Sequence, residues 1–133
     1  MAAIWTNSPE ISDVVLYEEK KDIGFCRKQA TVNVTAAFKI GTVVEDTIGD
    51  GTYDGINAAA TATLSADVGI VIDDAVYDGV TGDRTITILN MPAGGIAAIK
   101  DTGLAFLDAL DAAQTLIVTN ALAARGMKIY QTV

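Results

Sequence analysis

Three aspartates in a turn-rich stretch have the spacing closest to that of a metal site. Asp46, Asp50 and Asp54 fall at every fourth position around residues 49–55, GDGTYDG. A calcium loop of the EF-hand type needs oxygen ligands at alternate positions and a distant bidentate glutamate. No glutamate follows Asp54, and aspartate and glycine in such a run are typical turn formers. The sequence therefore favours a turn here, with calcium binding as the alternative.

A second group of acids could pair carboxylates for acid–base catalysis. It consists of Asp73, Asp74, Asp78 and Asp83, which lie in and around an expected hairpin loop over residues 78–83. Such catalysis needs an apolar pocket that raises the pKa of one carboxyl, and the flanking sequence shows none. We interpret these residues as solvated loop acids.

The single cysteine, Cys26, has bases beside it in Arg27 and Lys28, which favour a thiolate. The chain contains no histidine, so the thiol lacks its usual base partner and the usual zinc sites are excluded. The glycine-rich runs match neither the P-loop nor the dinucleotide-binding pattern. We predict that the chain is not an enzyme and carries no metal or cofactor.

Composition and charge narrow the class of protein further. With 133 residues, half of them hydrophobic, the chain can form one domain with a core. A net charge of −8 disfavours binding to nucleic acid. No apolar run approaches the roughly 20 residues of a membrane span, and no secretory signal is recognised. Five acids and five bases balance through residue 39, so the remainder carries the whole −8. We interpret this shift as a boundary between a neutral arm, residues 1–28, and an acidic body, residues 29–133.

The hydrophobic periodicity of the body predicts a β-rich α/β fold of the α+β type, with small, mainly antiparallel sheets and one C-terminal helix. Residues 84–89 alternate most clearly, with Ile86 and Ile88 inward. The helix is expected over residues 112–125, with Asp111 as its cap and Gly126 at its C′ position. Further strands are expected over residues 31–35, 38–44, 68–72, 96–99 and 127–133, and a loop over 49–55. Ala113, Leu116, Ile117, Ala121 and Ala124 share one face of the helix at helical spacing.

The first 28 residues show no sustained period and are expected to form an extended arm rather than a core element. Ile4, Trp5 and Phe25 either fold back onto their own domain or dock on another chain. Residues 11–17 form the best strand for addition to a partner's sheet, with Val15 and Tyr17 on one face and Val14 and Leu16 on the other. The candidate binding residues of the arm are Ile4, Trp5, Ile11, Val14, Val15, Leu16 and Tyr17.

The succession of short motifs in residues 38–133 resembles the head decoration proteins of tailed bacteriophages, the lambda gpD-like type. The motifs are GDGTYDG at 49–55, VGIVI at 68–72, TITIL at 85–89, IAAI at 96–99 with Leu104, and the final helix, Gly126 and strand. This resemblance implies a structural virion protein that is made in the host cytoplasm and binds the outer surface of the capsid. There it would form homotrimers at three-fold positions, contact the major capsid protein through its N-terminal segment, and cement the expanded, DNA-filled head.

The hairpin over 78–83 and the long, regular C-terminal helix depart from the lambda-like pattern, which leaves the trimer contacts open. The alternative function is a secreted or tail-associated β-rich binding module whose acidic loops bind calcium.

Overall fold

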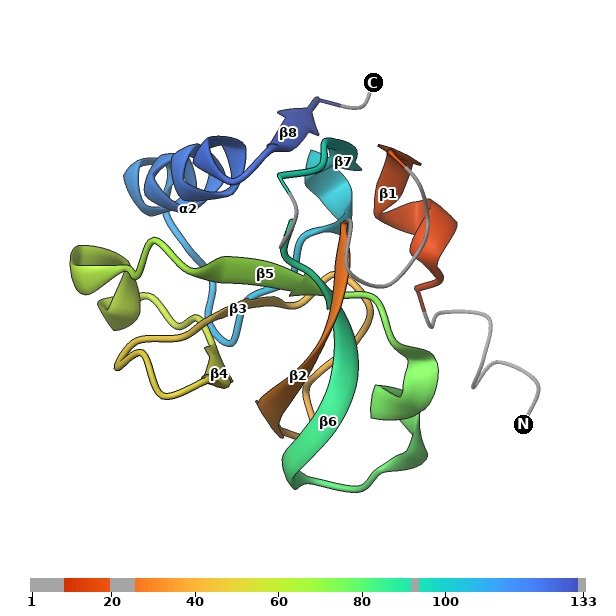
Figure 1. Cartoon of the computed structure of the whole chain (residues 1–133). Helices are drawn as coiled ribbons and strands as arrows, with labels where there is room; N and C mark the ends of the chain where they lie inside the picture. Colours follow the sequence, from red (N-terminus) through yellow and green to blue (C-terminus); the bar gives the residue numbers. More distant parts are fainter. Residues whose placement is uncertain (1–8, 20–25, 92–93, 132–133) are drawn as a thin grey trace.

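The computed structural model describes residues 9–19, 26–91 and 94–131. Two layers make up this part of the chain: a closed barrel and a three-stranded sheet flanked by the helix α2. In the view of Figure 1 the barrel strands lie below the layer of β1, β7, β8 and α2. The fold is β-rich with a C-terminal helix, so the expected α+β class is confirmed.

The barrel has the strand order β2-β4-β3-β5-β6 and closes by pairing β6 with β2. Its strands are β2 (Arg27–Val34), β3 (Val43–Glu45), β4 (Thr52–Gly55), β5 (Val68–Val71) and β6 (Gly82–Leu89). The second sheet has the order β1-β7-β8, formed by β1 (Val15–Glu18), β7 (Ala97–Lys100) and β8 (Met127–Tyr130). Short 3₁₀ helices are η1 (Ile11–Asp13), η2 (Ala59–Thr63), η3 (Asp74–Asp78) and η4 (Asp101–Gly103), and α2 spans Ala112–Ala124.

Alternation along β6 builds the interior of the barrel. Ile86 and Ile88 are buried, as expected, and pack with Val32, Val34 and Tyr53 from β2 and β4. β6 pairs with β2 along its whole length, from Arg27 opposite Leu89 to Val34 opposite Gly82. β-branched residues fit such a pleated, half-buried surface, which is why this strand is clear from the sequence.

The prediction of a loop over residues 49–55 is wrong for its second half. Thr52–Gly55 is the strand β4, which pairs parallel with β2 and antiparallel with β3. The Tyr53 side chain is buried inside the barrel. The turn residues thus end at Gly51, and pairing with two neighbours makes the remainder a strand.

The ends of α2 follow the expectation. The Asp111 carboxylate accepts a hydrogen bond from the Gln114 backbone N–H, and the Gln114 side-chain oxygen accepts one from the Asp111 backbone N–H. Gly126 has a φ of +91°. The helix packs against the core through few of its large apolar side chains. Val118 and Leu122 are its buried residues, whereas Leu116 and Ile117 face solvent with 58% and 43% of their surfaces exposed.

The described part of the N-terminal segment is packed into the body, so the expectation of an extended arm is wrong there. Val14 is fully buried in the core between the barrel and the second sheet, and β1 pairs antiparallel with β7. The boundary expected between the arm and the body, after residue 28, would fall inside β2, so it does not separate two structural units. η4 lies so close to Val14 that only glycine fits at position 103, because a Cβ on Gly103 would lie 2.7 Å from the Val14 Cα.

Candidate functional site: an exposed sheet edge at β1

β1 lies at an edge of its sheet. β7 occupies one side of β1, and none of the strands in the described part of the chain pairs with the other side. An edge strand leaves backbone N–H and C=O groups open to a strand from another molecule. β1 is therefore a place where a partner's backbone can bind.

A bulge turns two large apolar side chains of β1 to the surface. Val15 pairs with Ile99 and Tyr17 with Ala98, so Leu16 has no partner of its own. Leu16 and Tyr17 are 51% and 59% exposed, while Val14 is in the core. The expected alternation, with Val14 and Leu16 on one face, is wrong because the bulge interrupts it.

Beside these side chains runs a groove of about 310 Å³, here called the β1 groove. Its lining residues are Ile11, Ser12, Val15, Leu16, Tyr17, Glu18 and Arg27. Four of the expected binding residues, Ile11, Val15, Leu16 and Tyr17, thus meet at one site. Val14 is excluded from it by burial, and Ile4 and Trp5 lie outside the described residues.

An ion pair at the β1 groove joins the two layers of the fold. Arg27 of β2 donates from Nε to Glu18 Oε2 at 3.0 Å and from Nη2 to Glu18 Oε1 at 2.6 Å. The Glu18 side chain is almost completely buried, and its hydrogen bonds raise the pKa of the Arg27 guanidinium. Sequence reasoning missed this pair because the two residues are nine positions apart on different sheets, and only the fold brings them together.

The aspartates considered for calcium binding all accept hydrogen bonds within the chain, Asp46 and Asp50 from the backbone of their own turn and Asp54 from a side chain of β2. Asp46 accepts hydrogen bonds from the N–H groups of Gly49 and Gly51 at 2.9 and 3.0 Å, and Asp50 accepts one from Thr52. Asp54 accepts a hydrogen bond from the Asn33 amide. Within residues 9–19, 26–91 and 94–131, no three His, Cys, Asp or Glu side chains are grouped so that they could hold a metal ion.

The aspartates near the β5–β6 connection also have structural contacts. Asp73 caps η3 by accepting from the Ala75 N–H and also accepts from the Thr87 N–H of β6. Asp78 accepts from both terminal nitrogens of Arg84 at 2.9 Å. The Val80 N–H and Arg84 lower the pKa of Asp78, the opposite of what a general acid at neutral pH needs.

Cys26 is poorly placed for nucleophilic chemistry. The residue is buried, and its Sγ donates to the Glu19 carbonyl at 3.0 Å. Burial, with the nearby Glu18 charge, raises the pKa of the thiol, which outweighs any effect of the basic residues that follow it in the sequence.

A polar network joins the barrel to the C-terminal end of α2. Lys28 donates to the Tyr53 hydroxyl, which donates to Asp67, both at 2.9 Å. Asp67 also accepts from the Asn90 amide and lies 3.4 Å from the Arg125 guanidinium. Burial and the Asp67 hydrogen bond raise the pKa of Tyr53, so the hydroxyl is a poor base or nucleophile at neutral pH. The network therefore connects the C-terminal end of α2 to the barrel.

Comparison of the chain with known protein families, curated proteins and solved structures finds no match. Among the described residues, no helix combines the length and apolar character required to cross a membrane. The β1 edge combines an unpaired strand side, two exposed apolar side chains and a groove.

Proposed function

We propose that this chain is a non-enzymatic capsid decoration protein of a tailed bacteriophage. It binds the outer surface of the head as a homotrimer at three-fold positions. There it contacts the major capsid protein and cements neighbouring subunits of the expanded, DNA-filled shell. The observation that carries the proposal is the pair of exposed side chains Leu16 and Tyr17 on the open edge of β1.

The β1 edge suits a protein partner. A strand added to β1 would gain affinity from backbone hydrogen bonds and specificity from Leu16, Tyr17 and the β1 groove. The net charge of −8 disfavours a nucleic acid partner, since phosphates would be repelled. The motif succession in residues 38–133 supports the capsid as the partner, because it resembles that of head decoration proteins.

This assignment places the contact on the folded body as well as on the first residues of the chain. Ile4 and Trp5 precede the described residues and remain proposed contacts. Deleting residues 1–28 would remove β1 and part of β2. That deletion therefore tests folding, and point substitutions are needed to test binding.

The experiment uses expanded, decoration-free shells of the major capsid protein from the phage that encodes this chain. Wild-type protein should co-sediment with the shells, saturate, and raise the temperature at which they rupture. Tyr17→Asp should weaken binding at least about tenfold, because a charge would be desolvated at the centre of the contact. Ile48→Asp is the matched control, since Ile48 is an exposed apolar residue in the loop before β4, outside the β1 groove.

Wild-type protein that fails to bind these shells would overturn the proposed function. Equal binding of Tyr17→Asp and wild-type protein would remove the β1 edge from the contact. A melting temperature that falls when a chelator is added would instead support the calcium-binding module.

A further inference from the structure

The sheet β1-β7-β8 brings two lysines and two tyrosines to its outer face. The strand register places Tyr17, Ala98 and Lys128 opposite one another in one row, and Lys100 opposite Tyr130 in the next. Side chains that are directly opposite project from the same face of a sheet. The four large side chains Tyr17, Lys100, Lys128 and Tyr130 are here called the outer sheet face.

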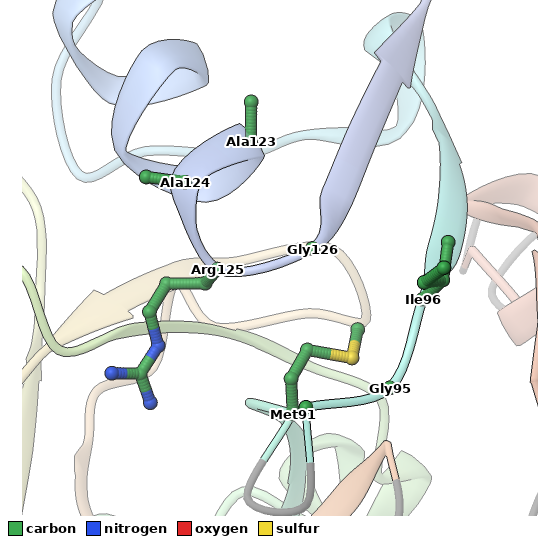
Figure 2. A pocket seen from close by; sticks show the side chains of 8 residues that line it. Met91, Gly95, Ile96, Ala123, Ala124, Arg125 and Gly126 are labelled. Carbon is green, nitrogen blue, oxygen red and sulfur yellow. The ribbon is translucent and has the colours of Figure 1, made fainter.

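The outer sheet face is open to solvent in the described structure. Tyr17, Lys128 and Tyr130 are exposed and Lys100 is half-buried. Figure 2 shows the end where the two strands begin, with Ile96 directly before β7 and Gly126 directly before β8. The opposite face of the sheet is the one that packs on the core, through residues such as Met127.

The two lysines of the outer sheet face have no carboxylate partner. Each arginine of the chain has one: Arg27 pairs with Glu18, Arg84 with Asp78 and Arg125 with Asp67. Within the described ranges, neither Lys100 nor Lys128 makes an ion pair or a hydrogen bond through its ammonium group. Both charges are therefore available to a carboxylate of another molecule.

The acids near the outer sheet face have partners within the chain. Glu18 is the one acid in the three strands, and its side chain is buried against Arg27. Asp101, which follows β7, accepts a hydrogen bond from the Thr102 N–H. The face is thus locally basic although the chain carries −8, and salt at physiological strength screens exposed charges beyond about 8 Å.

The spacing of the two lysines suits carboxylates at alternate positions of an extended peptide. Neighbouring strands are about 4.8 Å apart and alternate residues about 6.6 Å, so the Cα atoms of Lys100 and Lys128 lie about 8 Å apart on the diagonal. Alternate residues of an extended partner are about 7 Å apart, and the long lysine side chains cover the difference. The tyrosine rings offer apolar area to the aliphatic stems of the partner's side chains.

Two other occupants fit this face less well. A nucleic acid carries a phosphate at every nucleotide, so further phosphates would lie over the acidic remainder of the chain. A second copy of the chain does not supply the spacing, because no two of its 17 acids are two positions apart in the sequence.

We propose that the outer sheet face binds an extended segment of another protein that has carboxylates at alternate positions. Lys100 and Lys128 each contact one carboxylate, and Tyr17 and Tyr130 pack against the stems of the same side chains. The chemistry of the segment is inferred from the structure, while its location in the major capsid protein rests on the proposed function.

The first test uses an acetylated, amidated hexapeptide of alternating glutamate and valine, titrated into ¹⁵N-labelled protein and followed by NMR. Amide shifts should appear on β7 and β8 and saturate by about 10 mM peptide. Affinity should fall as salt rises from about 20 to about 200 mM, because the contacts are exposed ion pairs. A hexapeptide of alternating glutamine and valine is the matched probe without charge, and it should cause no saturable shifts.

Variants assign the binding to the outer sheet face. Lys100→Gln combined with Lys128→Gln should weaken peptide binding about tenfold, since exposed ion pairs are individually modest. Lys39→Gln is the control, because Lys39 is an exposed lysine between β2 and β3, away from this sheet. Tyr130→Ala also should weaken binding, and it provides a second variant at a fully accessible position. Unchanged thermal unfolding of each variant verifies the fold.

Four results would each overturn the proposal. They are the absence of shifts up to about 10 mM peptide, equal peptide affinity of the double lysine variant and wild-type protein, tighter binding of a thymidine hexanucleotide than of the peptide, and self-association of wild-type protein that the double lysine variant abolishes. The third result would assign the face to nucleic acid, and the fourth to a second copy.

Shell binding separates this proposal from the proposed function. Peptide binding at the outer sheet face without any binding to shells would retain the acidic segment and reject the capsid function. Equal shell binding by wild-type protein and the double lysine variant would retain the capsid function and reject a capsid segment as the occupant of this face.

Discussion

Replacing Val14 by alanine tests whether the N-terminal strand is part of the core. Val14 is fully buried with Ile40, Ile99 and other residues between the barrel and the second sheet. The substitution removes two methyl groups, worth about 0.8 kcal/mol each on transfer, and leaves a cavity between packed strands. The expected loss in the free energy of unfolding is about 2–3 kcal/mol. For a chain of 133 residues this lowers the melting temperature by about 7–11 °C.

Leu16→Ala is the matched control for Val14→Ala. It truncates an aliphatic side chain on the same strand at a position that is 51% exposed. Its cost should stay within about 0.5 kcal/mol, because surface substitutions away from specific contacts rarely exceed this. Calorimetry and urea unfolding of the three proteins supply the comparison. If Val14→Ala is no more costly than Leu16→Ala, Val14 is not part of the core.

Two further predictions concern buried polar groups. Arg27→Ala should lower the free energy of unfolding by about 3 kcal/mol, because it leaves the buried Glu18 carboxylate unpaired. Adding Glu18→Gln should restore part of that loss, as measured by urea unfolding. Equal stabilities of the single and double variants would contradict this prediction. The raised pKa of Tyr53 means that the folded chain keeps a proton that the unfolded chain releases above about pH 10. Stability should therefore fall as pH rises from 9 to about 11, and the fall should be smaller in Tyr53→Phe; identical slopes would refute the role of Tyr53.

The sequence predicts the parts of this fold that depend on local signals. The ends of α2 are clear because the capping pair Asp111 and Gln114 and the positive φ of Gly126 are local requirements. β6 is recognisable in the sequence because strict alternation of apolar and polar residues is typical of a half-buried strand. β4 was missed because Thr52 and Tyr53 become a strand only through pairing with β2 and β3.

The candidate site was only partly predictable. The apolar residues Val15, Leu16 and Tyr17 are visible in the sequence, but the bulge that exposes Leu16 arises from the register with β7. Periodicity grouped Leu116 and Ile117 on one face of α2, yet it does not say whether that face meets the core of the same chain. Their outward orientation is decided by Val118 and Leu122, which pack into the core instead.

The pairing of β1 with β7 delays completion of the proposed binding surface until late in synthesis. Val15 is opposite Ile99, and a ribosome working at typical bacterial rates needs about 4–17 s to make the residues between them. During this interval β1 has no neighbour with which to form its sheet. A chain that ends before β7 consequently lacks the pairing that forms the β1 edge, so it could not take part in the proposed binding through that edge.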